Sequence, residues 1–191
     1  GSQGKKRGTR NAERGTETMK LSTTRLDLIP FTADAIDALL AGNEAGLRAA
    51  TGVSFPTPLR PPPLLEEVLP LVRTRLREEP GTLGWWTWLT IDRSTNQVTG
   101  AIGFGGPPDA EGAVMIGYAT YPGSDRRGFA SEATRTLVDW ALAQPGVARV
   151  CASIPPDNIA ARRVAEKVGM RVAGTVWEEE IDDVLLYEKT R

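Results

Sequence analysis

The chain of 191 residues contains no histidine and only one cysteine, Cys151. Without histidine, the Ser-His and Cys-His pairs that activate nucleophiles cannot form, and neither can a histidine metal site. One cysteine allows no internal disulfide, and we expect no bound metal. The lone thiol is typical of a small buried hydrophobic side chain. The lack of a disulfide framework favours a reducing, cytoplasmic location.

The sequence also lacks an excess of charge of one sign and long apolar runs. Its 23 basic and 24 acidic residues give a net charge of −1, which indicates neither a nucleic-acid partner nor an anionic membrane surface. No apolar run approaches the ~20 residues of a membrane span, and no apolar segment follows the basic N-terminal residues as in an export signal. We therefore expect a cytoplasmic protein without nucleic-acid or membrane partners, and a monomer and a homodimer both remain open.

The first 19 residues differ from the rest of the chain. They are polar and without periodicity, and Gly1-Ser2 is typical of a remnant of cloning. We expect 1–19 to be a disordered tail, with its basic cluster diluted by Glu13 and Glu17. Residues 20–191 are long enough to bury a core of their own, so we expect a single domain there.

Hydrophobic periodicity predicts an α/β (α+β) fold. Alternating or β-rich segments predict strands over 25–31, 85–91, 98–104, 114–121, 147–153, 172–177 and 184–188. Helical spacing and capping residues predict helices from Thr32, over 65–76, after Ala130 and after Pro156. Pro70 is expected to kink or split the second helix, and the proline-rich 52–63 to form a loop. We expect Trp85, Trp86 and Trp88 to pack in the core rather than line an acceptor pocket.

Chemistry is indicated where a strand runs through Asp125-Arg126-Arg127-Gly128-Phe129-Ala130 into a helix. The first helical turn leaves about four backbone N–H groups unpaired, and the helix dipole adds roughly half a positive charge. Gly128 lets the backbone approach a ligand, and the two arginines add cationic donors. These features predict a phosphate site. The alternative is an ordinary exposed turn with two solvated arginines, and physics alone leaves both open.

The passage IGYATYPGSDRRGFASEATRTL resembles the acetyl-CoA pyrophosphate loop of the GNAT superfamily of N-acetyltransferases, Q/R-x-x-G-x-G/A, with Gly128-Phe129-Ala130 as its G-x-A part. DNIAARRVAEKVGM is similar to the N-x-A-S-x-x-V-x-E-K-x-G-F helix of the branch related to ribosomal-protein N-terminal acetyltransferases, and GFGGPPDAEG also resembles that branch. The resemblance runs from about Thr23 to the C-terminus. It implies a mostly antiparallel seven-stranded sheet with helices on both faces, splayed between the fourth and fifth strands.

The resemblance also implies acetyl-CoA as co-substrate. Its pantetheine arm would lie in the splay against main-chain groups of the fourth strand, and its pyrophosphate on the amides at the helix start. The binding residues so implied are Tyr118, Ala119, Thr120, Tyr121, Arg126, Arg127, Gly128, Phe129, Ala130, Ser131 and Asn158. For Asn158 the alternative is a polar residue that only starts a helix.

Three departures from the family pattern concern catalysis. Asp125 puts an anion beside the anion site where relatives have glutamine or arginine, and should weaken pyrophosphate binding unless its carboxylate turns outward. Met115 stands where relatives hold a glutamate that takes the amine proton. Ala161 and Ala165 stand where a serine or tyrosine is often close to the CoA sulfur.

An amine with a pKa near ~10.4 must lose a proton to attack a thioester. Glu178 and Glu180 share a face of the last hairpin and could act as a remote base, although a solvated hairpin face is the simpler interpretation. Tyr118, Tyr121 and Tyr187 are possible proton donors, but each is typical of a core or groove residue. The sequence therefore assigns no catalytic residue, and proximity alone could supply much of the rate.

These observations predict an N-acetyltransferase that moves acetyl from acetyl-CoA to a primary amine by direct transfer in a ternary complex. The acceptor could be a small-molecule amine or a protein N-terminus. Met115, Ala161 and Ala165 stand where relatives hold reactive groups. The alternative is therefore a non-catalytic acyl-CoA-binding or sensor module. An unrelated nucleotide-binding domain is a weaker one, and would bind nucleotides that lack the pantetheine arm.

Overall fold

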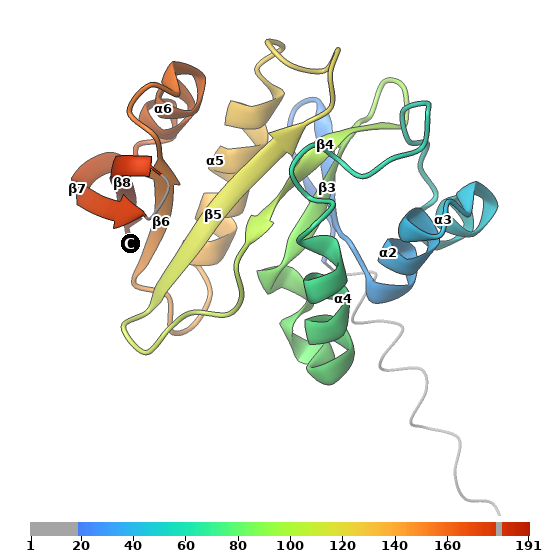
Figure 1. Ribbon diagram of the computed structural model, residues 1–191, viewed down its shortest axis with the longest axis horizontal. Coiled ribbons are helices and arrows are strands. Elements are labelled where there is room, and N and C mark those ends of the chain that lie inside the picture. The colour runs from blue at the N-terminus through green and yellow to red at the C-terminus, as the bar shows by residue number, and fades with distance from the viewer. Residues whose placement is uncertain (1–18, 179–180) are drawn as a thin grey trace, which may run out of the picture.

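The computed structural model describes residues 19–178 and 181–191, without the side chains of 176–178, 181 and 182. Within these ranges one sheet has the strand order β1-β2-β3-β4-β5-β6-β8-β7 (Figure 1). The strands are β1 (Leu21–Ser22), β2 (Leu26–Pro30), β3 (Thr87–Asp92), β4 (Gln97–Phe104), β5 (Ala113–Thr120), β6 (Arg149–Ile154), β7 (Arg171–Glu178) and β8 (Ile181–Thr190). The helices are α2 (Ala33–Leu40), α3 (Glu44–Thr51), α4 (Leu69–Glu78), the 3-10 helix η1 (Pro80–Trp85), α5 (Phe129–Leu142) and α6 (Ile159–Lys167).

The predicted fold class is confirmed, with eight strands in the described residues rather than seven. The additional strand is the short edge strand β1, which pairs antiparallel with β2. Helix α3 was not predicted, although its ends carry ordinary signals: Asn43 accepts a hydrogen bond from Gly46 N, and Gly52 ends the helix in the left-handed region. The disordered tail predicted for 1–19 falls outside the described residues except for Met19, which is half-buried against the core.

The kink expected at Pro70 is wrong. Helix α4 begins at Leu69, so Pro70 lies in its first turn, where a missing backbone N–H costs no intrahelical hydrogen bond. The apolar residues before Leu69 continue the helical spacing, but the chain there forms turns. The proline that marks the start of α4 was therefore interpreted as a break inside the helix.

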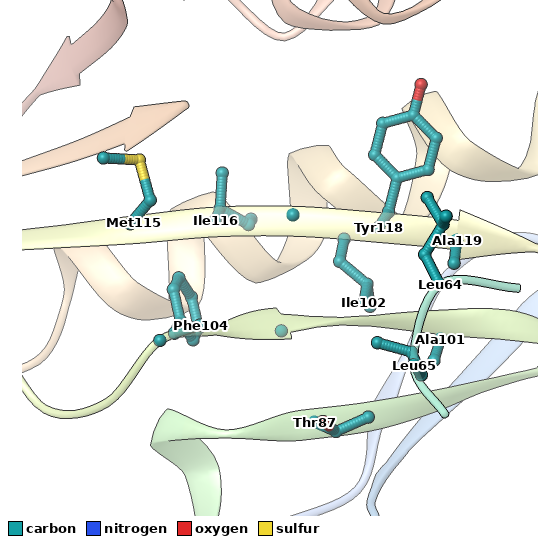
Figure 2. Close-up of a pocket in the computed structure, with 13 residues that line it drawn as sticks. Leu64, Leu65, Thr87, Ala101, Ile102, Phe104, Met115, Ile116, Tyr118 and Ala119 are labelled. Atoms are coloured by element: carbon teal, nitrogen blue, oxygen red, sulfur yellow. The ribbon is translucent and has the colours of Figure 1, made fainter. Parts of the chain in front are cut away.

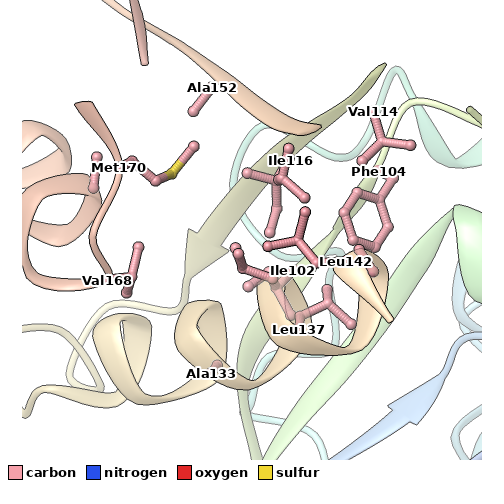
Figure 3. Packing of buried hydrophobic residues seen from close by; sticks show 14 of the residues in the cluster. Ile102, Phe104, Val114, Ile116, Ala133, Leu137, Leu142, Ala152, Val168 and Met170 are labelled. Atoms are coloured by element: carbon pink, nitrogen blue, oxygen red, sulfur yellow. The ribbon is translucent and has the colours of Figure 1, made fainter. Parts of the chain in front are cut away.

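Two apolar cores lie on opposite faces of the sheet. Helices α2, α3 and α4 cover one face, around the fully buried Phe31 and Leu89. Helix α5 crosses the other face, where Ile102, Ile116 and Leu137 pack together (Figure 3). The wide apolar stripe of α5 and the alternation along each strand fit this three-layer arrangement.

The tryptophans pack in the core as expected, but Trp85 does not follow the alternation that a strand over 85–91 implies. Trp85 and Trp88 both join the α5-side core and both contact Trp140, whereas Trp86 packs against the other core. The reason is that Trp85 ends η1 and does not lie in the strand, which begins at Thr87. Cys151 is buried and free, as expected.

The sheet opens between β5 and β6. These parallel strands pair only through Ala113–Arg149, Val114–Val150 and Met115–Cys151, although β5 continues to Thr120 and β6 to Ile154. From Ile116 onward the two strands diverge (Figure 1). This is the predicted splay between the fourth and fifth strands, which become β5 and β6 once β1 is counted.

Candidate functional site

A groove of about 230 Å³ fills the splay. Strands β5 and β6 form its sides, α5 contributes one lining residue, and α6 contributes three together with its N-cap Asn158. Its lining residues are Ile116, Gly117, Tyr118, Thr134, Ala152, Ser153, Ile154, Asn158, Ala161, Val164, Ala165 and Met170. We call it the β5/β6 groove. It includes Ala161 and Ala165, whose small side chains leave room where a larger residue would fill it.

The edge of β5 that faces this groove has free backbone groups. Tyr121 N donates to Thr99 O, and Met115 O accepts from Gly105 N, so odd-numbered residues direct their polar groups toward β4. Backbone groups alternate between the two edges of a strand, so Tyr118 and Thr120 direct theirs toward the groove. Because β6 pairs only as far as Met115 in the described chain, these groups are available to a ligand.

Thr134 supplies a second unsatisfied group. Its side chain projects from α5, lines the groove and is 3% exposed. Its Oγ1 has no hydrogen-bond partner among the described residues. A buried hydroxyl without a partner costs roughly 1–3 kcal/mol, so its presence here fits a groove that receives a polar ligand.

The start of α5 adjoins the same region. Gly128 is the N-cap residue, with φ +76°, and makes no side-chain cap hydrogen bond. Within the described chain, no protein acceptor takes the amides of Gly128, Phe129, Ala130 or Ser131. Arg126 also has a positive φ of +61°, so the loop curls tightly before the helix. The arrangement leaves an anion site of the predicted kind open.

Interactions with β2, β3 and α5 hold this loop in place. Phe129 is buried in the core, and the guanidinium groups of Arg25 and Arg127 both lie over its ring. Arg127 Nη2 also lies 3.5 Å from Oδ2 of the buried Asp92. The hydrogen bond from the Ser94 hydroxyl, opposed by burial, holds the pKa of Asp92 below its usual range. Asp92 is therefore an anionic anchor for Arg127 at neutral pH.

The structure places both other polar candidates of this region in local hydrogen bonds. Asn158 caps α6, with its Oδ1 accepting from Ala161 N at 3.1 Å, and it also lines the groove. Its capping role does not use the side-chain NH₂, which remains a possible donor to a ligand. Asp125 accepts from Gly123 N at 3.3 Å, so its carboxylate turns back onto the preceding loop.

A second cavity, of about 320 Å³, lies on the other side of β5 (Figure 2). We call it the Leu64 pocket. It is lined by Leu64, Leu65, Thr87, Ala101, Ile102, Gly103, Phe104, Gly105, Met115, Ile116, Gly117, Tyr118 and Ala119. Ile116, Gly117 and Tyr118 line both cavities, so the two meet at the middle of β5, where the sheet opens.

Of the three tyrosines considered as proton donors, only Tyr118 lines the two cavities. Burial raises the pKa of its hydroxyl, which is therefore protonated at neutral pH. Tyr121 donates to Arg60 O at 2.6 Å, and the Tyr187 hydroxyl lies against Arg162 and Glu166. The side chains of Glu178 and Glu180 fall outside the described part of the chain.

Several site residues had little signal in the sequence. Leu64 follows the proline-rich segment 52–63 that was interpreted only as a loop, Leu65 was expected to begin the second helix, and Asp92 lies directly after the predicted strand 85–91. Thr134 carried a detectable signal, since it lies one helical turn after Ala130 on the apolar face of α5. A threonine on a core-facing stripe indicates either a back-bonded hydroxyl or a contact with a ligand.

Two further findings concern other kinds of site. Among the described residues, no group of three or more cysteine, aspartate or glutamate side chains is arranged to hold a metal ion. None of the described helices combines the length and the apolarity needed to cross a bilayer.

A splayed mixed sheet, with free amides at the start of the helix beside the splay, is the arrangement that a GNAT acetyltransferase requires. The chain belongs to this family: the family model described as an acetyltransferase (GNAT) domain matches residues 25–171. The resemblance stated from the sequence is thereby confirmed.

Curated relatives match part of the chain. The uncharacterized N-acetyltransferase YjdG of Bacillus subtilis (strain 168) is 34% identical over 103 residues, which are 54% of this chain and 61% of that protein. The uncharacterized N-acetyltransferase YoaA of the same organism is 32% identical over 89 residues, 47% of this chain and 50% of that protein. The chain thus matches only about half to three fifths of the length of these relatives.

Solved structures match nearly the whole fold. An acetyltransferase (GNAT family) from Bacillus anthracis has a TM-score of 0.60 at 20% identity, covering 90% of this chain and 98% of that one. RimL, a ribosomal L7/L12 α-N-protein acetyltransferase in complex with coenzyme A, has a TM-score of 0.64 at 20% identity, covering 90% and 97%. At these identities the likeness shows the fold and leaves the substrate of this chain open.

Proposed function

We propose that this protein is an N-acetyltransferase that moves acetyl from acetyl-CoA directly to a primary amine in a ternary complex. The observation that carries the proposal is the meeting of the β5/β6 groove and the Leu64 pocket at Ile116, Gly117 and Tyr118. Two cavities that converge on one point from opposite sides of a strand allow donor and acceptor to be bound together. Holding both reactants in one place supplies a large share of the rate in such reactions.

In this proposal the β5/β6 groove receives the pantetheine arm. The backbone groups of Tyr118 and Thr120 and the Thr134 hydroxyl offer hydrogen bonds along it. The amides of Gly128 to Ser131 would hold the pyrophosphate, with Arg126 and Arg127 adding positive charge. The residues predicted from the sequence to bind acetyl-CoA therefore keep that role as a proposal, with Phe129 and Tyr121 acting through packing because both are buried.

The reaction needs two proton movements. The amine nitrogen forms a C–N bond with the thioester carbonyl carbon, the C–S bond breaks, the nitrogen loses a proton and the CoA thiolate gains one. The described residues that line the two cavities include no carboxylate, so we propose that water receives the amine proton. Tyr118 is placed to protonate the thiolate, because it lines both cavities and its hydroxyl is protonated at neutral pH.

The matched pair Ala161→Leu and Ala160→Leu tests the donor site. Both residues lie in α6, but Ala161 lines the groove and Ala160 is exposed. We expect Ala161→Leu to weaken CoA binding at least about tenfold, the equivalent of ~1.4 kcal/mol, by calorimetry, and Ala160→Leu to bind as the parent does. Equal affinities in all three proteins would place CoA elsewhere.

Thiol release on mixing with acetyl-CoA and a panel of amines tests the transfer itself. Amine-dependent release supports the enzyme. Tight binding of CoA without release for any amine would instead favour the sensor module. A cytoplasmic location stays a prediction that rests on the single free cysteine.

A further inference from the structure

Among the described residues, no charged side chain lines the Leu64 pocket. Of these described lining residues, only Thr87 and Tyr118 have polar side chains, and the others are aliphatic, aromatic, methionine or glycine. Met115, which also lines the pocket, is 46% exposed. A second positive charge on an acceptor would therefore lose water without gaining a counter-charge, which is costly.

The floor of the pocket is apolar and flat because small residues form two rows across three strands. Thr87, Gly103 and Gly117 pair in one row, and Ala101 and Ala119 pair in the next. A Cβ at Gly103 would lie 2.0 Å from Trp86 O, so close strand packing requires glycine there. A Cβ at Gly117 would meet nothing within 4 Å, so that glycine leaves space in the site that the fold does not need.

Leu64 lies at the mouth of the pocket in a strained backbone conformation. It has φ +71°, a conformation that costs a residue other than glycine roughly 1–2 kcal/mol. It is also 88% exposed, so burial within the chain does not offset that strain. A strained and exposed leucine beside an apolar cavity is explained if it contacts an apolar ligand.

The pocket shares Ile116, Gly117 and Tyr118 with the proposed donor groove. An amine nitrogen at that junction would place the rest of its molecule against Leu64, Leu65 and Met115. The cavity of about 320 Å³ is at the small end of ligand pockets, which run from roughly 300 to 1,000 Å³.

We propose that the acceptor is a small primary monoamine whose one substituent is apolar and uncharged. This inference rests on the acetyl transfer proposed above and specifies its second substrate. It excludes polyamines and amino sugars as preferred acceptors, since these bring further charges or hydroxyl groups into a lining that cannot pair with them. It also disfavours a peptide N-terminus, whose polar backbone would have to enter the same cavity.

The test compares kcat/KM for phenylethylamine, putrescine, glucosamine and a short peptide with an alanine N-terminus, all with acetyl-CoA. We expect phenylethylamine to exceed each of the others at least about tenfold, the size of discrimination that an apolar pocket provides. A higher kcat/KM for any of the other three would overturn the acceptor class and leave acetyl transfer standing. Absence of turnover for all four, with CoA bound, would overturn the proposed function and the acceptor class together.

A pair of variants, Leu64→Asp and its control Leu71→Asp, tests whether Leu64 causes the preference for an apolar amine. Aspartate tolerates a positive φ better than leucine, so Leu64→Asp should fold. Leu71 is also exposed, at 51%, but lies in α4 outside the pocket. We expect Leu64→Asp to lower kcat/KM for phenylethylamine about three- to tenfold and to raise it for putrescine. Leu71→Asp should leave the ratio of the two within about twofold. Equal effects of the two variants on this ratio would place the acceptor away from Leu64.

Discussion

The guanidinium carbon of Arg127 lies 4.4 Å from the centroid of the Phe129 ring. The two residues flank Gly128, so the loop turns sharply enough for its arginine to stack on the first side chain of α5. Phe129 is buried, and Arg127 continues to Asp92 on β3. The free amides at the helix start are therefore held to the sheet by a cation-π contact and an ion pair.

Replacing Asp92 by asparagine tests this anchor. Asparagine keeps an acceptor for the Ser94 hydrogen bonds but loses the charge that faces Arg127. We expect CoA affinity to fall by about three- to tenfold, which corresponds to roughly 1 kcal/mol, measured by calorimetry at low ionic strength. Asp109→Asn is the control, because Asp109 also accepts backbone amides in a turn but lies outside both cavities. If both variants bind CoA as tightly as the parent, the Asp92–Arg127 pair does not position the site.

Gly128→Val tests whether the start of α5 binds the pyrophosphate. Valine is disfavoured at φ +76°, and its Cβ would lie 3.3 Å from Arg25 Nη2. We expect a loss of stability of roughly 1–2 kcal/mol from the backbone together with weaker CoA binding. Gly52→Val supplies the same backbone strain at φ +73° at the end of α3, with no neighbour within 4 Å. Calorimetry on both should show weakened binding for Gly128→Val alone, and equal binding would refute the placement of the pyrophosphate.

Thr134→Val should change stability and binding in opposite directions. The valine is nearly isosteric and removes a buried hydroxyl that has no partner among the described residues. We expect the free protein to gain about 1 kcal/mol, since the desolvation cost of that hydroxyl disappears. CoA affinity should fall several-fold if the hydroxyl bonds to the pantetheine arm. Thermal unfolding without and with CoA measures both effects, and an unchanged ligand-induced shift would remove Thr134 from the site.

Tyr118→Phe tests proton donation to the leaving thiolate. We expect kcat to fall by about 10²-fold, the usual order for a lost general acid, with CoA affinity nearly unchanged. Tyr121→Phe is the matched variant, because its hydroxyl donates to Arg60 O and should affect stability by about 1 kcal/mol rather than kcat. A Tyr118→Phe enzyme with the parent kcat would leave thiolate protonation to solvent.

The folding stability of the protein at acid pH should depend on Glu132 of α5. Burial acts to raise the pKa of this carboxyl, but hydrogen bonds from Thr23 and Arg25 outweigh it and bring the pKa below its usual 4.5. A carboxyl with a lowered folded-state pKa stabilises the protein above its unfolded pKa, and the contribution is lost as the pH falls through the folded value. We expect Glu132→Gln to cost about 1–2 kcal/mol at neutral pH and to lose less stability than the parent below pH 4.5.

Denaturant unfolding across this pH range measures the difference. Glu111→Gln is the control, because its side chain is 81% exposed and makes only a long contact with Arg149. The same slope of stability against pH in the parent and in Glu132→Gln would show that the Glu132 contacts contribute nothing.

Features encoded within a few residues were predicted from the sequence. Thr32 caps α2 as expected. The strand that leads into Gly128 and α5 was also recognised, because alternation, capping and glycine at a left-handed position are local properties. The same locality explains the error at Pro70, where only the true start of α4 distinguishes a first-turn proline from a kink.

The cavities, in contrast, are made by residues far apart in the chain. Leu64 lies beside Tyr118 only because the loop before α4 passes over β4 and β5 (Figure 2), and Asp92 meets Arg127 across 35 residues. Whether Thr134 finds a partner depends on how far β5 and β6 diverge. The amino-acid order alone determined most of the elements and the glycine turn before α5, since these depend on backbone geometry and neighbouring side chains. Tertiary packing decided which apolar surface stays open and which polar groups stay unpaired, because both are properties of surfaces that meet only after folding.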